Sequence, residues 1–224
     1  MTRSLAWKFS PFGEAALLIE ADTTDVLANR YALALATALE ALAFPGLLAT
    51  VPALGSLLLR FDPLRCTHEQ LEAQVRDLLA DLAPAPEQPT RIVEIPVVYG
   101  GEHGPDLESA AELLGLSARE VVALHSGQVY RVMMIGFAPG FPYIGPLPEQ
   151  LAIPRRTTPR AAVPARSVAI AAGLTGIYPK RLPGGWHIIG CTPLEMFDPQ
   201  LQPPALLAPG DGVRFVPLAE GVQP

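Results

Sequence analysis

Three arginines on one short segment are the residues of this sequence best suited to binding an anion. Arg155, Arg156 and Arg160 lie on the segment 154–164, which begins and ends with proline. Proline restricts the backbone, and guanidinium groups on a stiff loop can hold a carboxylate or phosphate through paired hydrogen bonds. The alternative is that one arginine forms an ion pair with an acidic residue elsewhere in the chain and serves only to stabilise the fold. As anion ligands we favour Arg155 and Arg160 over the nearby Arg166.

The charge distribution also favours an anionic ligand. The segment 150–194 contains six lysines and arginines and no aspartate or glutamate, although the whole chain has a formal charge of −6. A basic island in an acidic protein suits an anionic small molecule, whereas the overall charge argues against nucleic acid as a partner. A solvated loop whose charges pair with acids elsewhere is the alternative.

A loop rich in glycine, proline and aromatic residues, 136–145, is the second candidate segment. Glycines permit close backbone approach and prolines fix the intervening geometry, so the loop can form a rigid, partly apolar pocket wall. The residues expected to form it are Phe137, Pro139, Gly140, Phe141 and Tyr143. Packing in the core is the alternative, and it suits the phenylalanines better than Tyr143, whose hydroxyl group requires a polar partner.

Two adjacent glycines, Gly184 and Gly185, precede Trp186 and His187. Backbone amides at such glycines can be exposed to a ligand oxygen, and Trp186 is either a lid over the ligand or a core residue. No Gly-Lys-Ser/Thr follows, so the motif assigns no ATP phosphates to this segment. The glycine-rich segment 173–179 is similarly constrained.

Candidates for proton transfer are His125, Tyr143 and His187. His125 ends a predicted helix just before the strand that leads into the aromatic loop, where a general acid or base is plausible. The alternative is a structural histidine favoured by the helix dipole. No nucleophile with its base can be argued from spacing, and Asp106 is expected to cap a helix. Two cysteines and four histidines have no metal-ligand spacing, which predicts a chain without a metal site.

The candidate segments lie in a second half whose pattern predicts many short strands. Glycine and proline recur between short apolar runs, which is typical of a β-sandwich or barrel. The runs expected to be strands are 92–98, 129–135, 168–172, 186–190 and 213–216. Two helices precede most of them. One covers 106–114 and ends at Gly115, and the other begins with a capping box at 117–120.

The first half predicts a small α+β layer with the element order β-α-β-β-α. Expected strands cover 15–19, 47–51 and 56–61. One helix covers 25–42 with Thr23 or Thr24 as its N-cap, and a second begins with a capping box at 67–70. Three prolines in the segment 83–89 predict a stiff linker, so we expect two domains, 1–86 and 90–220.

We expect the chain to be cytoplasmic. No secretory signal follows the first residues, no apolar stretch approaches the length of a membrane span, and the two cysteines suit a reducing compartment. The mean hydropathy is high, +0.29. Together with aromatic residues that we expect to be exposed, Phe141 and Trp186 among them, this predicts a surface for a protein partner.

Several motifs together resemble the allophanate hydrolase subunit 1 family. They are 99–107, 125–126, 136–145, 154–156 and 183–190. They occur in the expected order over nearly the whole chain, and the long glycine and proline motifs are highly specific. The family includes the B subunits of 5-oxoprolinases and the sporulation-kinase inhibitor KipI, and it is related to part of the carboxyltransferase region of urea carboxylase. One departure is His187, where many relatives have an amide residue.

The resemblance implies an α+β protein, with a small N-terminal α+β domain followed by a cyclophilin-like β-barrel domain. It also implies the role of the B subunit in an ATP-dependent 5-oxoprolinase, active only with an A subunit and with a C subunit that has a related barrel. The complex would convert 5-oxo-L-proline, ATP and water to L-glutamate, ADP and phosphate. Two other roles remain open: a KipI-like inhibitor of a histidine kinase, and a component of a urea carboxylase or allophanate-type complex. The fold alone does not imply prolyl isomerase activity.

Overall fold

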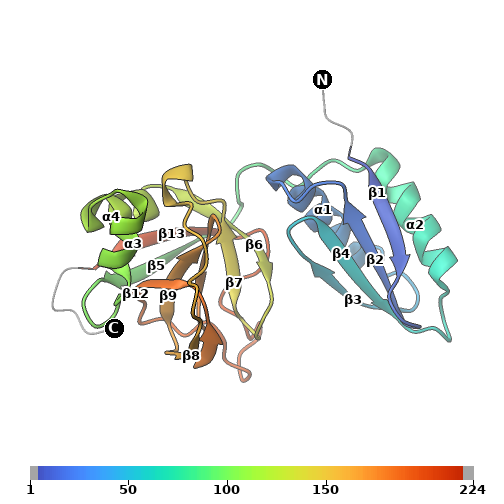
Figure 1. The fold of residues 1–224 in the computed structure, drawn as a ribbon. Helices are drawn as coiled ribbons and strands as arrows, with labels where there is room; N and C mark the ends of the chain where they lie inside the picture. Colours follow the sequence, from blue (N-terminus) through green and yellow to red (C-terminus); the bar gives the residue numbers. More distant parts are fainter. Residues whose placement is uncertain (1–4, 219–224) are drawn as a thin grey trace. The chain divides into compact units, whose positions relative to one another are not determined.

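The chain divides into two compact units, residues 1–87 and 88–224, in a computed structural model that describes residues 5–218. The boundary falls inside the proline-rich segment 83–89. Each unit has its own hydrophobic core. Figure 1 shows the ribbon of both units. In the described part of the chain, no helix is long and apolar enough to cross a membrane.

The first unit is a four-stranded antiparallel sheet with two helices. The sheet order is β1-β2-β4-β3. Its elements are β1 (Trp7–Pro11), β2 (Ala16–Ala21), α1 (Val26–Ala41), β3 (Leu47–Pro52), β4 (Ser56–Phe61) and α2 (His68–Asp81). Apolar side chains of β2 and β4 form one core with α1 and α2. The predicted α+β layer is therefore present, with β1 as an additional edge strand.

The helix starts in this unit follow from local sequence. The capping box at 67–70 forms as predicted, because Thr67 and Gln70 each accept a hydrogen bond from the other's backbone. For α1 the expected cap is wrong by one or two residues. Asp25, rather than Thr23 or Thr24, accepts the hydrogen bond from the amide of Ala28, at 2.9 Å.

The second unit is a closed seven-stranded barrel in the order β10-β7-β6-β13-β5-β12-β9. These strands are β5 (Ile92–Tyr99), β6 (Val129–Ile135), β7 (Pro142–Gly145), β9 (Ser167–Ala171), β10 (Leu174–Ile177), β12 (His187–Cys191) and β13 (Gly212–Pro217). Neighbours are antiparallel except β13 and β5, which are parallel. The predicted α+β class with a β-barrel is confirmed.

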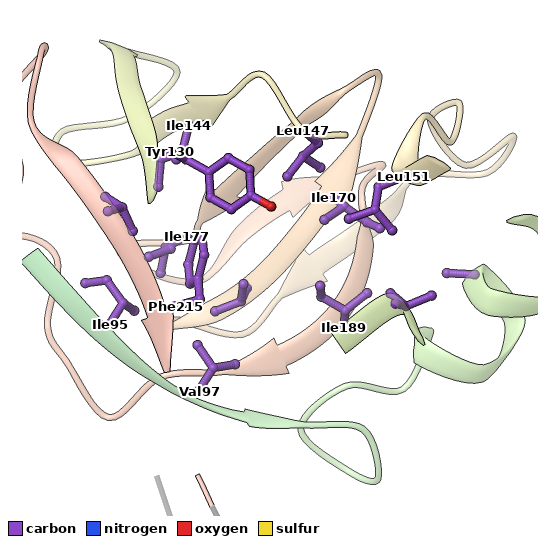
Figure 2. Packing of buried hydrophobic residues seen from close by; sticks show 14 of the residues in the cluster. Ile95, Val97, Tyr130, Ile144, Leu147, Leu151, Ile170, Ile177, Ile189 and Phe215 are labelled. Carbon is purple, nitrogen blue, oxygen red and sulfur yellow. The ribbon is translucent and has the colours of Figure 1, made fainter. Parts of the chain in front are cut away.

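Helices and strands share the barrel core. Tyr130, Ile177 and Phe215 come from three strands and meet in its interior (Figure 2). The helices α3 (Leu107–Leu114) and α4 (Ala118–Ser126) pack on each other and on the strands, and add Ala110 and Val121 to this core. Gly115 ends α3 in the left-handed conformation, and the predicted capping box begins α4.

A second, smaller cluster lies on the opposite face of the barrel strand β9. Ala169 and Ala171 belong to this cluster, whereas Val168 and Ile170 face the barrel interior, as strand alternation requires. The hairpin-like pair β8 (Arg160–Val163) and β11 (Leu182–Gly184) lies nearby and contributes Val163. This outer cluster supports the candidate site.

Candidate active site

The outer cluster opens into a pocket of about 300 Å³. Most of the residues singled out from the sequence meet there, although they come from three separate segments. The lining residues are Phe137, Phe141, Tyr143, Arg155, Arg156, Pro159, Tyr178, Pro183, Gly184, Gly185 and Trp186. The first unit has a larger hollow of about 420 Å³ beside the end of α1, but it contains none of the predicted site residues.

Aromatic rings form the wall of the pocket. Phe141 packs edge-on against Trp186, with ring centroids 5.9 Å apart, and Tyr143 packs edge-on against the same indole at 5.8 Å. Phe141 and Trp186 are 2% and 6% exposed, whereas Phe137 is 60% exposed. The expectation that Phe141 and Trp186 present an exposed surface to a partner is therefore wrong, because the outer cluster buries both.

Two phenol groups lie in the wall beside one guanidinium group. Burial raises the pKa of Tyr143, and the positive charge of Arg155 partly offsets that effect. Burial and the nearby Tyr143 raise the pKa of Tyr178, which Arg155 and Arg160 partly offset. Both hydroxyl groups therefore stay protonated near neutral pH and can donate hydrogen bonds. Tyr178 is not among the residues predicted for the site, although it belongs to the constrained glycine-rich segment 173–179.

The two adjacent glycines have different roles in the pocket. A Cβ atom at Gly184 would overlap the hydroxyl oxygen of Tyr178, so this position must be glycine for Tyr178 to fit. Gly185 has more room, with its nearest neighbours in Pro159 at 3.7 Å from such an atom. The carbonyl of Gly185 accepts a hydrogen bond from the amide of Arg156, at 2.8 Å. This bond joins the arginine segment to the glycine wall.

Arg156 and Arg160 are bound to a buried carboxylate. Arg160 donates two hydrogen bonds of 2.7 Å to Asp106, and Arg156 donates one of 3.0 Å. The amide of Ile188 donates a fourth, at 2.8 Å. The prediction that the Asp106 side chain caps a helix is wrong, because it makes no capping hydrogen bond to α3. Burial alone would raise the pKa of Asp106, but Arg160, the Ile188 amide and Arg156 together lower it.

Arg155 differs from its two neighbours. It is exposed and makes no ion pair or hydrogen bond with another of the residues 5–218. It lines the pocket next to both phenol groups. Of the predicted arginines, Arg155 is thus the one whose guanidinium group is available to a ligand.

Both candidate histidines lie outside the pocket lining. His125 is fully buried in the barrel. Its Nδ1 and Nε2 atoms are hydrogen-bonded to the hydroxyls of Tyr99 and Thr175, at 2.7 and 2.9 Å. Burial lowers the pKa of His125 to about 3. The Nε2 of His187 donates to the carbonyl of Pro154 at 3.0 Å, while its buried Nδ1 has no hydrogen-bond partner in the described part of the chain.

The remaining predicted wall residues, Pro139 and Gly140, form a turn. Gly140 has a positive φ of 77°, and a Cβ there would come within 2.6 Å of the Phe197 side chain. Pro139 precedes it in the same turn, and neither residue lines the pocket. Among residues 5–218 there is no group of three His, Cys, Asp or Glu that could hold a metal ion.

Curated proteins similar to this chain include two 5-oxoprolinase B subunits. The 5-oxoprolinase B subunit of Bacillus subtilis (strain 168) is 40% identical over 228 residues, which cover 97% of this chain and 95% of that protein. The 5-oxoprolinase B subunit of Escherichia coli O157:H7 is 57% identical over 136 residues, covering 61% of this chain and 62% of that protein.

Solved structures extend this similarity to the fold. The crystal structure of TTHA0988 matches with a TM-score of 0.80 and 42% identity over 94% of this chain, which spans only 41% of that chain. The urea carboxylase of Kluyveromyces lactis matches with a TM-score of 0.75 but 16% identity, over 96% of this chain and 22% of that chain. At that identity the match supports the fold alone.

A family model described as the carboxyltransferase domain, subdomain C and D, matches residues 7–207. The relation to 5-oxoprolinase B subunits that the motifs indicate is therefore confirmed. With urea carboxylase the chain shares the fold. The chain belongs to the family of the carboxyltransferase domain, subdomains C and D, alongside the 5-oxoprolinase B subunits.

Proposed function

We propose that this chain is the B subunit of a cytoplasmic, ATP-dependent 5-oxoprolinase that is active only together with the A and C subunits. One observation carries the proposal: a small pocket combines an aromatic wall with a free guanidinium group. It lies in a chain that is 40% identical, over almost its whole length, to a 5-oxoprolinase B subunit.

The pocket suits a small cyclic acid. Its volume of about 300 Å³ is at the lower end of the range for ligand pockets, roughly 300–1,000 Å³. The five-membered ring of 5-oxo-L-proline is apolar on its faces, as are the rings of Phe141 and Trp186. Its carboxylate would bind Arg155, and its lactam oxygen would accept hydrogen bonds from Tyr143 and Tyr178.

The reaction explains why donors and positive charge are needed. A lactam is a poor electrophile, so transfer of phosphate from ATP to its carbonyl oxygen would activate it before water attacks. Phosphoryl transfer depends mainly on positioning and on neutralising charge, which guanidinium groups and backbone amides can provide. The products are L-glutamate, ADP and phosphate.

The residues that line the pocket are consistent with a reaction that requires partner subunits. Among the described residues that line it there is no aspartate, glutamate or histidine. A general base for the attacking water must therefore come from another chain or another element. Phe137, which is 60% exposed at the edge of the pocket, is the aromatic residue best placed to contact the C subunit.

The proposal is tested by reconstituting the complex. We expect this chain, co-purified with its A and C partner subunits, to hydrolyse ATP only when 5-oxo-L-proline is present and to release glutamate in equal amount, whereas the chain alone releases none. Glutamate release by the chain alone would contradict the dependence on partners. A stable complex without ATPase activity that depends on 5-oxo-L-proline would reject the proposed reaction. A KipI-like role would then be tested by inhibition of a histidine kinase.

A further inference from the structure

The Asp106 carboxylate is fully occupied by the protein itself. Its Oδ1 accepts hydrogen bonds from Arg156 and Arg160, and its Oδ2 accepts from Arg160 and from the amide of Ile188. Its side chain is 5% exposed. Two bonds to each oxygen use the acceptor capacity of a carboxylate, so Asp106 is not free to take a proton from substrate or water.

This carboxylate connects three parts of the barrel unit that are distant in sequence. Asp106 lies at the start of α3, Ile188 lies in β12, and the two arginines lie about 50 residues after Asp106. The backbone amides of Asp106 and Ile188 strengthen the connection, because Asp106 N also donates to the Ile188 carbonyl at 2.9 Å. The arginine segment is thus attached to the barrel through the buried Asp106 carboxylate.

Arg156 connects the Asp106 carboxylate to the pocket. Arg156 lines it, and the amide of Arg156 is bonded to the carbonyl of Gly185, the residue before Trp186. Two guanidinium groups share one carboxylate, so the cluster retains a net positive charge. Arg155, the residue before Arg156, has no such partner in the described chain and lines the pocket together with the two phenol groups.

We propose that Asp106 is a positioning residue: it fixes Arg156 and Arg160 as the frame of the arginine segment, so that Arg155 alone binds the carboxylate of the substrate. The identity of that substrate rests on the proposed function, but the positioning role does not. The two can therefore be tested separately.

The positioning role is tested without substrate by limited trypsin digestion of the full chain, with the cleavage sites identified by mass spectrometry. Trypsin cuts after arginine, so cleavage after Arg155, Arg156 and Arg160 reports how firmly the segment is held. We expect Asp106→Asn to accelerate this cleavage about tenfold or more, since hydrogen bonds to charged groups are lost. Glu108→Gln, which removes an exposed carboxylate from the same helix, should leave it unchanged.

The role in substrate binding is tested by steady-state kinetics of the complex with the A and C subunits. We expect Asp106→Asn and Arg155→Ala each to raise the KM for 5-oxo-L-proline about tenfold or more. Of these two variants, Asp106→Asn alone should also accelerate cleavage of the segment by trypsin. Arg160→Lys keeps the charge but loses the paired geometry, so it should shift both measurements in the direction of Asp106→Asn. It also serves as the test if Asp106→Asn fails to fold.

Unchanged cleavage in both Asp106→Asn and Arg160→Lys would overturn the positioning role. So would faster cleavage accompanied by wild-type KM and kcat, which would make the cluster purely structural. A wild-type KM in Arg155→Ala would overturn the assignment of the substrate carboxylate. If the wild-type complex does not act on 5-oxo-L-proline at all, the proposed function fails, and the digestion alone decides whether Asp106 holds the segment.

Discussion

The barrel interior and the pocket on its outer face use similar side chains for different purposes. Inside, Tyr99, His125 and Thr175 satisfy one another's hydrogen bonds and contain no net charge. Outside, Tyr143 and the buried Tyr178 line a pocket of about 300 Å³ together with Arg155. A phenol group enclosed with neutral partners stabilises the fold, whereas one beside an unpaired cation at an opening is available to a ligand.

The largest expected effect separates the buried aromatic ring from the exposed one. Phe141→Ala removes a side chain that is 2% exposed, so the free energy of unfolding should fall by about 3–5 kcal/mol. Phe137→Ala, at a ring that is 60% exposed, should change it by less than about 1 kcal/mol but weaken association with the C subunit. Chemical denaturation and co-purification measure the two effects. Equal losses of stability would remove the distinction between the two rings.

The adjacent glycines provide the next test. Gly184→Ala places a methyl group on the Tyr178 hydroxyl, so the wall must move, and overpacking of this kind typically destabilises by about 1–3 kcal/mol. Gly185→Ala has room and should keep the wild-type melting temperature. Melting curves and the KM for 5-oxo-L-proline would measure both. A Gly184→Ala variant with wild-type values would show that Tyr178 does not depend on this space.

The interior histidine predicts a pH dependence of stability. Burial lowers the pKa of His125 to about 3, whereas in the unfolded chain it is about 6.5. Between these values the unfolded state binds a proton that the folded state excludes, so the stabilisation is complete above about pH 6.5 and is lost as pH falls toward 3. From this residue we expect a loss of about 2 kcal/mol between pH 7 and pH 5.

Other groups titrate in the same interval, so the measurement compares two proteins. Urea denaturation of wild type and of His125→Gln at several pH values isolates the contribution of His125, because glutamine can keep hydrogen bonds to both neighbours without titrating. The kcat of the assembled complex should not change in this variant. Identical pH dependence in the two proteins would contradict a buried, neutral His125.

The smallest effects come from removing single hydroxyl groups. Tyr99→Phe leaves Nδ1 of His125 without its partner and should lower the free energy of unfolding by about 1 kcal/mol, with no change in KM. Tyr143→Phe should do the opposite, raising the KM several-fold while the melting temperature stays constant. Both variants are measured by the same denaturation and kinetic assays. If both affect stability alone, the outer phenol group is structural as well.

The parts of the fold that sequence predicts well are those fixed by neighbouring residues. Both capping boxes form because their partners are three residues apart, and the predicted strand 129–135 has the bounds of β6. The strands β7, β8, β10 and β11 have only three or four residues, too few for a periodic pattern. The edge strand β1 does alternate, with Trp7 and Phe9 packed on the core, but its pattern spans only five residues and ends at Pro11.

The candidate site also has parts that local sequence predicts and parts that it does not. The aromatic and glycine segments are visible in the sequence because unusual residues are concentrated within each of them. The attachment of Arg156 and Arg160 to Asp106 spans about 50 residues, so no local pattern indicates it. Likewise, a histidine at the end of a helix can face either the barrel interior or the pocket. Only the closure of the barrel determines that His125 faces inward.

The parallel pairing of β13 with β5 also has a consequence for synthesis of the protein. Gly212 to Pro217 pair with residues 120 positions earlier, and this pairing closes the barrel. All elements of the first unit are complete by Asp81, so it can fold while the ribosome is still translating. By Cys191 six of the seven barrel strands have been made, yet the barrel stays open until β13 emerges. During that interval its apolar interior is exposed, and exposed apolar surface with unpaired strand edges favours aggregation until β13 is made.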